Sequence, residues 1–413
     1  MRSKSKAEGA SGPAADPAVE ASEQTVRLRA SAAAMARKGR LWFYADDLAG
    51  GVLPERALVR VVDERDRDLG LGFASAQSRL ALRLCGAWPE AGVPDREAFF
   101  QRRLDAAIER RAGRLGPEDG VRIVHGEGDG LPGLVIDRYG PVTVVQSTSA
   151  VVEHALDAIV PHLVGRLSAE AVVARNDTST RRHEGLPREV RLLHGRRIEE
   201  TSILEHGVRH QIQPFTGHKT GFYLDQRPAR ARVRELAKGR RVLDLFSYQG
   251  AFSLCALAGG ASSVLAVDQS EAALERARIA ADSNGLSGLE VAQANVFDLV
   301  RELRKEERLF DLIVLDPPAF AKSRRELSGG LRGYRDLNRQ AMRLLAPHGV
   351  LVTCSCSFHV SLPRFEDVLR QAAAGLPFAC ALTERLGAGP DHPAILSLPE
   401  SEYLKVVVLQ RLG

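Results

Sequence analysis

Two of the five cysteines in this 413-residue chain, Cys354 and Cys356, lie one residue apart where the apolar run GVLVTCSCSF ends. A thiol that is partly ionised and open to a ligand acts as a nucleophile, whereas a thiol in a core only packs. The cysteines are scattered and odd in number, and no C-x-x-C pair or histidine cluster at zinc spacing accompanies them. We therefore expect neither a disulfide framework nor a metal site. The other three stand in apolar contexts and are predicted to pack: Cys85, Cys255 and Cys380.

Acidic residues stand at or near the ends of three further apolar runs: Asp244 in RVLDLFS, Asp268 in SSVLAVDQS and Asp316 in DLIVLDPP. An acidic residue that closes the second strand of a nucleotide-binding unit accepts hydrogen bonds from ribose hydroxyls, which suits Asp268. The alternative is that Asp268 caps a helix over 271–283. The turn DLFSYQGAF keeps one glycine, Gly250, and lacks G-x-G-x-x-G, so it is a poor pyrophosphate cradle. A cofactor with adenosine but no phosphate fits better, and S-adenosylmethionine is the commonest of these.

The segment from Asp316 to Phe320 reads DPPAF. Its two prolines fix the backbone just past the strand and remove two N–H donors. Such a rigid turn can hold a carboxylate and a following aromatic ring against a flat substrate.

From about residue 215, helical stretches separate these short apolar runs. Strands that alternate with helices and are apolar on both faces predict an α/β fold with a parallel, doubly wound sheet. Ligands of such sheets bind beyond the carboxyl ends of the strands. The carboxylates and the cysteine pair should therefore meet at one edge.

The chain divides into four predicted segments. Residues 1–24 lack an apolar stretch and are expected to be a disordered tail, neither a secretory signal nor a transit peptide. Residues 25–95 predict a small β domain, 96–190 a middle α/β domain, and 191–413 the last α/β domain, entered through a hairpin at 191–214. No apolar run approaches the roughly 18 residues that span a bilayer. We expect a cytoplasmic protein whose thiols stay reduced.

The balance of charge mildly favours an acidic partner, because the formal net charge is +5 and the isoelectric point about 9.0. Arg37, Lys38 and Arg40 run into the aromatic residues Trp42 and Phe43 at the start of the β domain. Interleaved basic and aromatic residues can grip a nucleic-acid backbone and stack on bases. We expect the two rings to be core and the three charges to face solvent or RNA.

Several motifs together resemble the bacterial 23S ribosomal RNA large-subunit methyltransferase I family. They are TGHKTGFYLDQR (216–227), VLDLFSYQGAFS (242–253), DPPAFAKS (316–323), RGYRDLN (332–338), the SCS at 355–357, DHP with YLK near 391–405, and GEGDGLPGLVIDRYG (126–140). The resemblance covers roughly residues 25–413. It implies an N-terminal PUA RNA-binding module at 25–95 and a Rossmann-like class I methyltransferase domain that uses S-adenosylmethionine to make 5-methylcytosine in ribosomal RNA.

The resemblance also implies roles for individual residues. Carbon 5 of cytosine is a poor nucleophile until a thiolate adds to carbon 6, and the family pattern makes Cys356 that thiolate and leaves Cys354 as packing. Asp316 would hydrogen-bond the amidine edge of the base, and Phe320 would stack on it or fill the pocket wall. The implied cofactor shell consists of Gln226, Arg227, Phe246, Ser247 and Gly250, with Asp244, Asp268 and Asp316 from the strand ends and Asn295 where relatives carry an acidic residue.

Two other functions stay open at this point. An exocyclic-amine methyltransferase acting on RNA guanine or adenine uses an Asn/Asp-Pro-Pro-aromatic turn and needs no thiol, but here the aromatic residue comes one place late, at Phe320. A non-catalytic RNA-binding assembly factor would keep the cofactor fold without the chemistry. Large-subunit ribosomal RNA is the expected partner, and the chain itself is a candidate for a homodimer.

Overall fold

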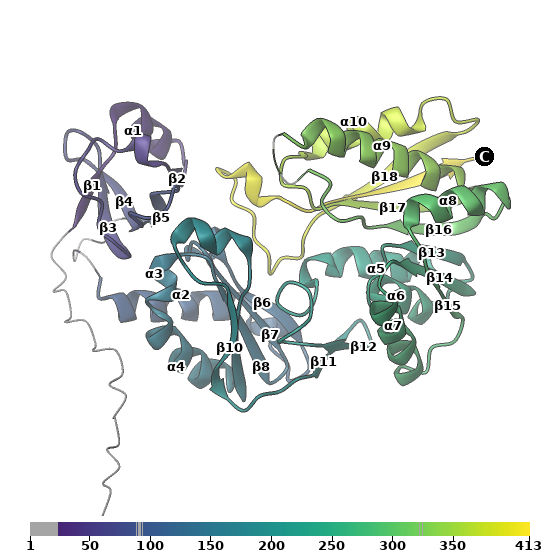
Figure 1. Cartoon of the computed structure of the whole chain (residues 1–413), viewed down its shortest axis with the longest axis horizontal. Coiled ribbons are helices and arrows are strands. Elements are labelled where there is room, and N and C mark those ends of the chain that lie inside the picture. Colours follow the sequence, from purple (N-terminus) through teal and green to yellow (C-terminus); the bar gives the residue numbers. More distant parts are fainter. Residues whose placement is uncertain (1–23, 88, 90–91, 93, 322, 324) are drawn as a thin grey trace, which may run out of the picture.

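The computed structural model describes residues 24–413 except 88, 90, 91, 93, 322 and 324. The expected tail over 1–24 therefore lies outside the described residues, apart from Gln24. Three sheets and one hairpin follow one another along the chain, and Figure 1 shows them as separate bodies joined through the middle one.

The first sheet has five strands in the order β1-β3-β4-β5-β2, with helix α1 beside it. Phe43 is fully buried in its core, as expected, but Trp42 is only half-buried, because its indole Nε1 donates to Glu127 of the next body at 3.0 Å. The elements are β1 (Thr25–Arg27), α1 (Ala30–Arg37), β2 (Trp42–Phe43), η1 (Ala45–Asp47), β3 (Ala57–Val62), β4 (Asp68–Ala74) and β5 (Leu82–Gly86).

The middle sheet also has five strands, in the order β10-β9-β8-β7-β6. Helix α2 begins at Asp95, whose side chain accepts from the Ala98 backbone N–H, and it buries Phe99, Phe100, Leu104 and Ile108 against the sheet. β10 runs to Gly195 and pairs with β9, so the expected domain boundary at residue 190 cuts through this sheet. The elements are α2 (Arg96–Arg110), η2 (Ala112–Arg114), β6 (Gly120–His125), η3 (Gly126–Asp129), β7 (Leu134–Tyr139), β8 (Val142–Ser147), α3 (Ala150–Glu153), α4 (Leu156–Leu167), β9 (Ala171–Asn176), η4 (Ser179–Glu184) and β10 (Glu189–Gly195).

Within the segment expected to be a hairpin, 191–214, β11 (Thr201–Glu205) pairs with β12 (Val208–Ile212), whereas residues 191–195 belong to β10 of the middle sheet. The two turn residues between β11 and β12, His206 and Gly207, both have left-handed backbones with φ of +52° and +78°. That is the conformation that a two-residue turn between antiparallel strands requires.

The last sheet has seven strands in the order β15-β14-β13-β16-β17-β19-β18, parallel from β15 to β17 and antiparallel at β19 and β18. Residues alternate between two cores along each strand: Ile313 and Leu315 pack with α8–α10, whereas Leu312 and Val314 pack with α5 and α6. This explains runs that are apolar on both faces. The elements are η5 (Leu224–Gln226), α5 (Arg227–Leu236), β13 (Arg241–Leu245), α6 (Ala251–Ala258), β14 (Ser263–Asp268), α7 (Glu271–Ser283), β15 (Leu289–Gln293), α8 (Val296–Lys305), β16 (Phe310–Leu315), α9 (Leu327–Arg343), β17 (Leu345–Ser355), α10 (Leu362–Ala373), β18 (Ala379–Leu386), η6 (Pro399–Ser401) and β19 (Lys405–Leu412).

The doubly wound sheet expected from the sequence is therefore present. In the part of the chain that the structure describes, no helix is long and apolar enough to cross a membrane.

Candidate active site

A cavity of about 510 Å³ opens where the carboxyl ends of β13, β14 and β16 meet the segments that follow β12 and β17. Eight of the predicted site residues line it: Gln226, Phe246, Ser247, Asp268, Asn295, Asp316, Phe320 and Cys356. Three predicted cofactor residues, Arg227, Asp244 and Gly250, are not part of its wall. The strand-end rule thus brings most of the predicted residues together.

The two neighbouring thiols have different surroundings. Cys354 is fully buried in the core between the sheet and helices α5 and α6, and burial raises the pKa of its thiol well above the ordinary range. Cys356 comes one residue after β17 ends and lines the cavity. Burial is the largest cause that raises the pKa of Cys356, and the Asp316 carboxylate is the next. The positive charges of Lys219 and Lys405 lower this pKa. Only Cys356 is placed to meet a ligand.

Asp316 faces the cavity beside Cys356. Its Oδ2 accepts a hydrogen bond from Gln226 Nε2 at 3.0 Å. Burial, followed by the nearby Asp225 carboxylate, raises the pKa of Asp316 to about 7. A carboxyl group in this state is partly protonated near neutral pH, so it can donate as well as accept a hydrogen bond.

Asp268 holds the turn after β13 with both carboxylate oxygens. Oδ2 accepts from the Tyr248 backbone N–H and Oδ1 from the Ser270 backbone N–H, each at 2.9 Å. The N-cap of α7 is Ser270, whose side chain accepts from the Ala273 backbone N–H at 3.2 Å. The helix over 271–283 is therefore capped by Ser270, and Asp268 remains on the cavity wall.

Asp244 and Gly250 support the turn after β13 from outside the cavity lining, and a cofactor contact by either stays a prediction. Asp244 is buried, and its Oδ2 accepts from the backbone N–H and the hydroxyl of Ser253, at 3.1 and 2.6 Å. Burial raises the pKa of Asp244 to about 7. Gly250 has φ of +74°, and a Cβ there would come within 2.9 Å of the Ala277 Cβ. Both residues are needed for the backbone path and for helix packing.

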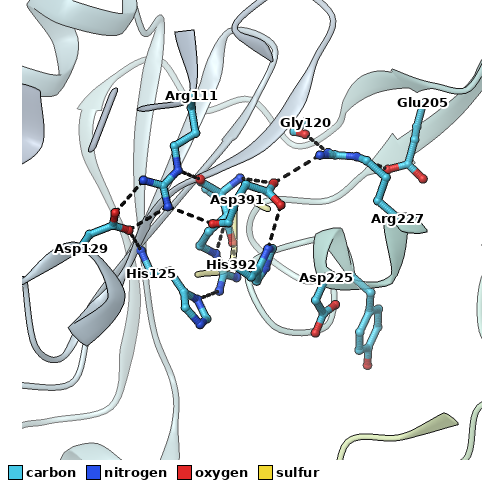
Figure 2. A network of polar contacts seen from close by, with 12 residues as sticks. Arg111, Gly120, His125, Asp129, Glu205, Asp225, Arg227, Asp391 and His392 are labelled. Carbon is cyan, nitrogen blue, oxygen red and sulfur yellow. Dashed lines mark hydrogen bonds and ion pairs between the residues drawn. The ribbon is translucent and has the colours of Figure 1, made fainter. Parts of the chain in front are cut away.

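Arg227 belongs to a network between the middle and last sheets rather than to the cavity. Figure 2 shows its guanidinium between Glu205 and Asp391, 3.0 and 3.3 Å from their carboxylate oxygens, with a further hydrogen bond to the Gly120 carbonyl. Asp391 also accepts from the Arg122 backbone N–H at 3.2 Å, and its own carbonyl accepts from Arg111 at 3.0 Å. With these partners Arg227 is a structural residue, and the prediction of a cofactor contact is not supported.

The sequence analysis gave no role to several residues around the cavity, although the motif TGHKTGFYLDQR contains five of them: His218, Lys219, Phe222, Tyr223 and Asp225. Lys219 lines the cavity and pairs with the buried Asp225 at 2.8 Å. Asp225 also accepts from the Tyr403 hydroxyl at 2.7 Å. Lys405 donates to the carbonyls of Ser357 at 2.8 Å and Tyr403 at 2.6 Å, and so holds the backbone beside the nucleophile candidate.

The three predicted RNA-binding charges of the first sheet differ in their partners. Arg37 pairs with Asp63, and Arg40 with Asp47 at 3.0 Å. Lys38 is exposed. Internal carboxylates therefore compete with any phosphate at two of the three positions.

One group of side chains in the described ranges has ligand atoms close enough to share a metal ion: Glu205, His210 and Cys255. Arg230, however, donates to both carboxylate oxygens of Glu205, at 2.6 and 3.0 Å, and burial raises the pKa of Cys255 to about 12. A buried guanidinium and a protonated thiol oppose cation binding there.

Comparison with known proteins shows the family to which the chain belongs. A profile of S-adenosylmethionine-dependent methyltransferases matches residues 141–406, and one of PUA-like domains matches 26–85. The chain is 37% identical over 378 residues to the ribosomal RNA large subunit methyltransferase I of Photobacterium profundum, covering 89% of this chain and 94% of that one. The homologue of the same name from Erwinia tasmaniensis is 39% identical over 356 residues, covering 84% and 88%. The chain belongs to the ribosomal RNA large subunit methyltransferase I family.

Solved structures agree with the fold. A methyltransferase complexed with SAH superposes with a TM-score of 0.81 at 22% identity, covering 94% of this chain and all of the other. A SAM-dependent methyltransferase from Streptococcus mutans gives 0.79 at 21% identity, with the same coverage. The last sheet is thus the Rossmann-like methyltransferase fold, and the first is PUA-like, as expected.

The enzyme uses S-adenosylmethionine, and the cavity fits that cofactor. Ser247 Oγ and Gln226 Oε1 are buried on its wall without a hydrogen-bond partner among the described residues. Buried polar atoms without a hydrogen-bond partner are rare in proteins unless a bound ligand supplies that partner. Asp268 and Asn295 add polar groups, and Phe246 and Phe297 add apolar surface.

Proposed function

We propose that the enzyme makes 5-methylcytosine in 23S ribosomal RNA through a transient covalent bond between Cys356 and the base. The observation that carries this proposal is that the Cys356 thiol and the Asp316 carboxyl group line one cavity, while Cys354 is buried behind it. The name of the homologues supports ribosomal RNA as the substrate.

In the proposed reaction, the Cys356 thiolate adds its electron pair to carbon 6 of cytosine. The former C5–C6 π pair shifts to C4–C5 as nitrogen 3 takes a proton, and carbon 5 becomes nucleophilic. Bound S-adenosylmethionine supplies an electrophilic methyl group to that carbon. A base then takes the carbon-5 proton, the C–H pair forms the C5–C6 double bond as the C6–S bond breaks and frees the Cys356 thiolate, and nitrogen 3 returns its proton to Asp316.

Asp316 is proposed to orient the base and to place a proton at nitrogen 3. Its raised pKa of about 7 favours this role, because a protonated carboxyl group can donate to a ring nitrogen that accepts. Gln226 would fix its rotamer through the hydrogen bond to Oδ2. Phe320, which packs on Tyr334 with centroids 4.8 Å apart, would form the wall beside the base.

The ionisation of Cys356 is opposed by burial and by the carboxylates of Asp316 and Asp225, and is supported by Lys219 and Lys405. Protonation of Asp316 removes the larger of the two opposing charges, so proton binding at one group favours proton loss at the other. We infer that the thiolate forms mainly when Asp316 is neutral.

Asp268 would accept hydrogen bonds from the ribose, Asn295 one from the adenine amino group, and Gln226 and Ser247 would complete the shell. The PUA-like domain, roughly residues 25–95, would add RNA affinity through exposed charge such as Lys38.

Mapping methylated nucleosides by mass spectrometry in ribosomal RNA from a deletion strain tests the proposal. A single cytosine should lose its 5-methyl group and regain it with the purified enzyme. Loss of a methyl group from a guanine or adenine amine would favour the exocyclic-amine alternative. No change in any nucleoside would favour the assembly-factor alternative.

A homodimer, a cytoplasmic location and a protein free of bound metal complete the proposal. Light scattering of the purified chain checks the first, fractionation of cells the second, and metal analysis of the protein the third.

A further inference from the structure

Two aromatic rings form a parallel stack on the cavity wall. The rings of His218 and Tyr248 have centroids 4.2 Å apart and an interplanar angle of 11°. His218 comes from the segment between β12 and η5, and Tyr248 from the turn after β13. Both residues line the cavity, and the reaction proposed above uses neither.

The stack is held in place by hydrogen bonds from three sides. The Tyr248 hydroxyl accepts from the His218 backbone N–H at 3.4 Å and from Gln249 Nε2 at 3.3 Å. His218 Nδ1 lies 3.2 Å from the Tyr223 hydroxyl. The Tyr223 ring stands nearly perpendicular to both rings, at 75° and 78°. The stack is therefore ordered before any ligand arrives.

The backbone at the stack is in an unusual conformation. Tyr248 has φ of +50° and the neighbour of His218, Lys219, has φ of +51°. Left-handed backbone is costly for large side chains and tends to persist at functional sites. The hydrogen bond from Tyr248 N–H to Asp268 fixes this conformation.

The stack has the exposure and charge of a nucleotide platform rather than of a core. His218 is exposed although one of its ring faces lies against Tyr248. The next residue, Lys219, keeps 38% of its side chain exposed and holds Nζ 4.4 Å from the centroid of the Tyr223 ring. Flat rings beside a cation suit an unpaired base and its phosphate, and unpaired RNA bases are recognised by stacking on such side chains.

We propose that the His218–Tyr248 stack is a binding site for an RNA base adjacent to the target cytosine. This inference rests on the proposed function, because it assumes that the cytosine is drawn into the same cavity. Stacking of the neighbouring base would help to keep the cytosine out of its helix while the thiol reacts.

The test uses the full-length enzyme and RNA fragments that span the cytosine identified by nucleoside mapping. His218→Ala should weaken RNA binding and raise the KM for RNA about tenfold, the range that loss of one stacked base gives. The kcat and the affinity for S-adenosylmethionine should stay near wild type. His218→Phe should restore RNA affinity, because it keeps a flat ring. His154→Ala, at an exposed histidine of the middle body, is the matched control and should change nothing.

A fluorescent base reports the stacking directly. With 2-aminopurine in place of one neighbour of the cytosine and then the other, one of the two positions should be quenched by wild type and by His218→Phe, but not by His218→Ala. The inference is overturned if neither position is quenched by wild type, or if His218→Ala binds RNA normally. It is also overturned if that variant loses cofactor affinity instead, because the stack would then belong to the cofactor. Failure of the proposed function would appear separately, as absence of 5-methylcytosine formation by wild type.

Discussion

Gln226 Nε2 donates a hydrogen bond to Asp316 Oδ2 at 3.0 Å, across 90 residues of sequence. The neighbour of Gln226, Asp225, accepts from Lys219 and from Tyr403, so the carboxyl group at the end of β16 is tied to the segment that precedes α5 and to the segment that enters β19. Three parts of the chain thereby meet beside the proposed catalytic carboxyl group of Asp316.

Mutation should distinguish the roles of Cys354 and Cys356. Cys356→Ala should lower methyl transfer by several orders of magnitude while cofactor and RNA still bind, because no other group can activate carbon 5. Cys354→Ala is the matched control and should lower activity only modestly through packing. RNA carrying 5-fluorocytosine should trap wild type and Cys354→Ala as adducts that survive denaturant. If Cys354→Ala were inactive and Cys356→Ala active, the nucleophile would be the buried thiol.

Asp316 should make stability depend on pH. Its pKa is about 7 in the folded state against an ordinary value of 3.8, so the folded protein binds more protons between these values. The contribution of Asp316 to the free energy of unfolding is therefore most favourable at low pH and declines as the pH rises through about 7. Asp316→Asn should raise the melting temperature relative to wild type more at pH 8 than at pH 5. An equal effect at both values would contradict the raised pKa.

Asp268→Ala should weaken S-adenosylmethionine binding about tenfold or more, because charge-assisted hydrogen bonds to the ribose are lost. Calorimetry measures the affinity. Since Asp268 also holds the Tyr248 turn, Ser270→Ala is a useful control, because it removes the cap of α7 and leaves Asp268 intact. If Asp268→Ala bound S-adenosylmethionine as tightly as wild type, Asp268 would not contact the ribose.

Arg227→Ala should lower the free energy of unfolding by about 3 kcal/mol, because it leaves the buried Glu205 and Asp391 short of a partner. Below its melting temperature the variant should bind S-adenosylmethionine like wild type. Arg232→Ala, on the same helix, removes a more exposed pair with Glu384 and should cost less than about 1 kcal/mol. Weaker cofactor binding by a folded Arg227→Ala protein would restore the sequence-based role.

RNA binding should depend strongly on salt, and Lys38→Glu should weaken it and reduce the slope with salt by about one or more. A point change is preferable to removal of residues 1–95, because Arg83 pairs with the buried Glu184 at 2.6 Å and truncation would expose that carboxylate without its partner. Lys305→Glu, an equal change of charge at the end of α8, is the control. Equal slopes for Lys38→Glu and wild type would mean that Lys38 makes no phosphate contact.

The sequence was sufficient for features that local pattern controls. Helix 271–283, a hairpin before the last domain and the parallel sheet follow from periodicity and residue type, and the strand-end rule brought Cys356 and Asp316 together. It failed where a polar side chain has a partner far along the chain. Arg227 pairs with Asp391 across 164 residues, and Trp42 bonds to Glu127 across 85. Composition and spacing carry no signal for such partners.

Asp391 contacts Arg111, Arg122 and Arg227 from a loop close to the carboxyl terminus (Figure 2). During synthesis the chain emerges from its amino terminus, so these arginines leave the ribosome long before Asp391 does. The middle body can form its own sheet early, and Arg111, Arg122 and Arg227 then already have the carboxylates of Asp129, Asp137 and Glu205. The contacts that Asp391 adds between the middle sheet and the methyltransferase sheet form only after Asp391 has been made.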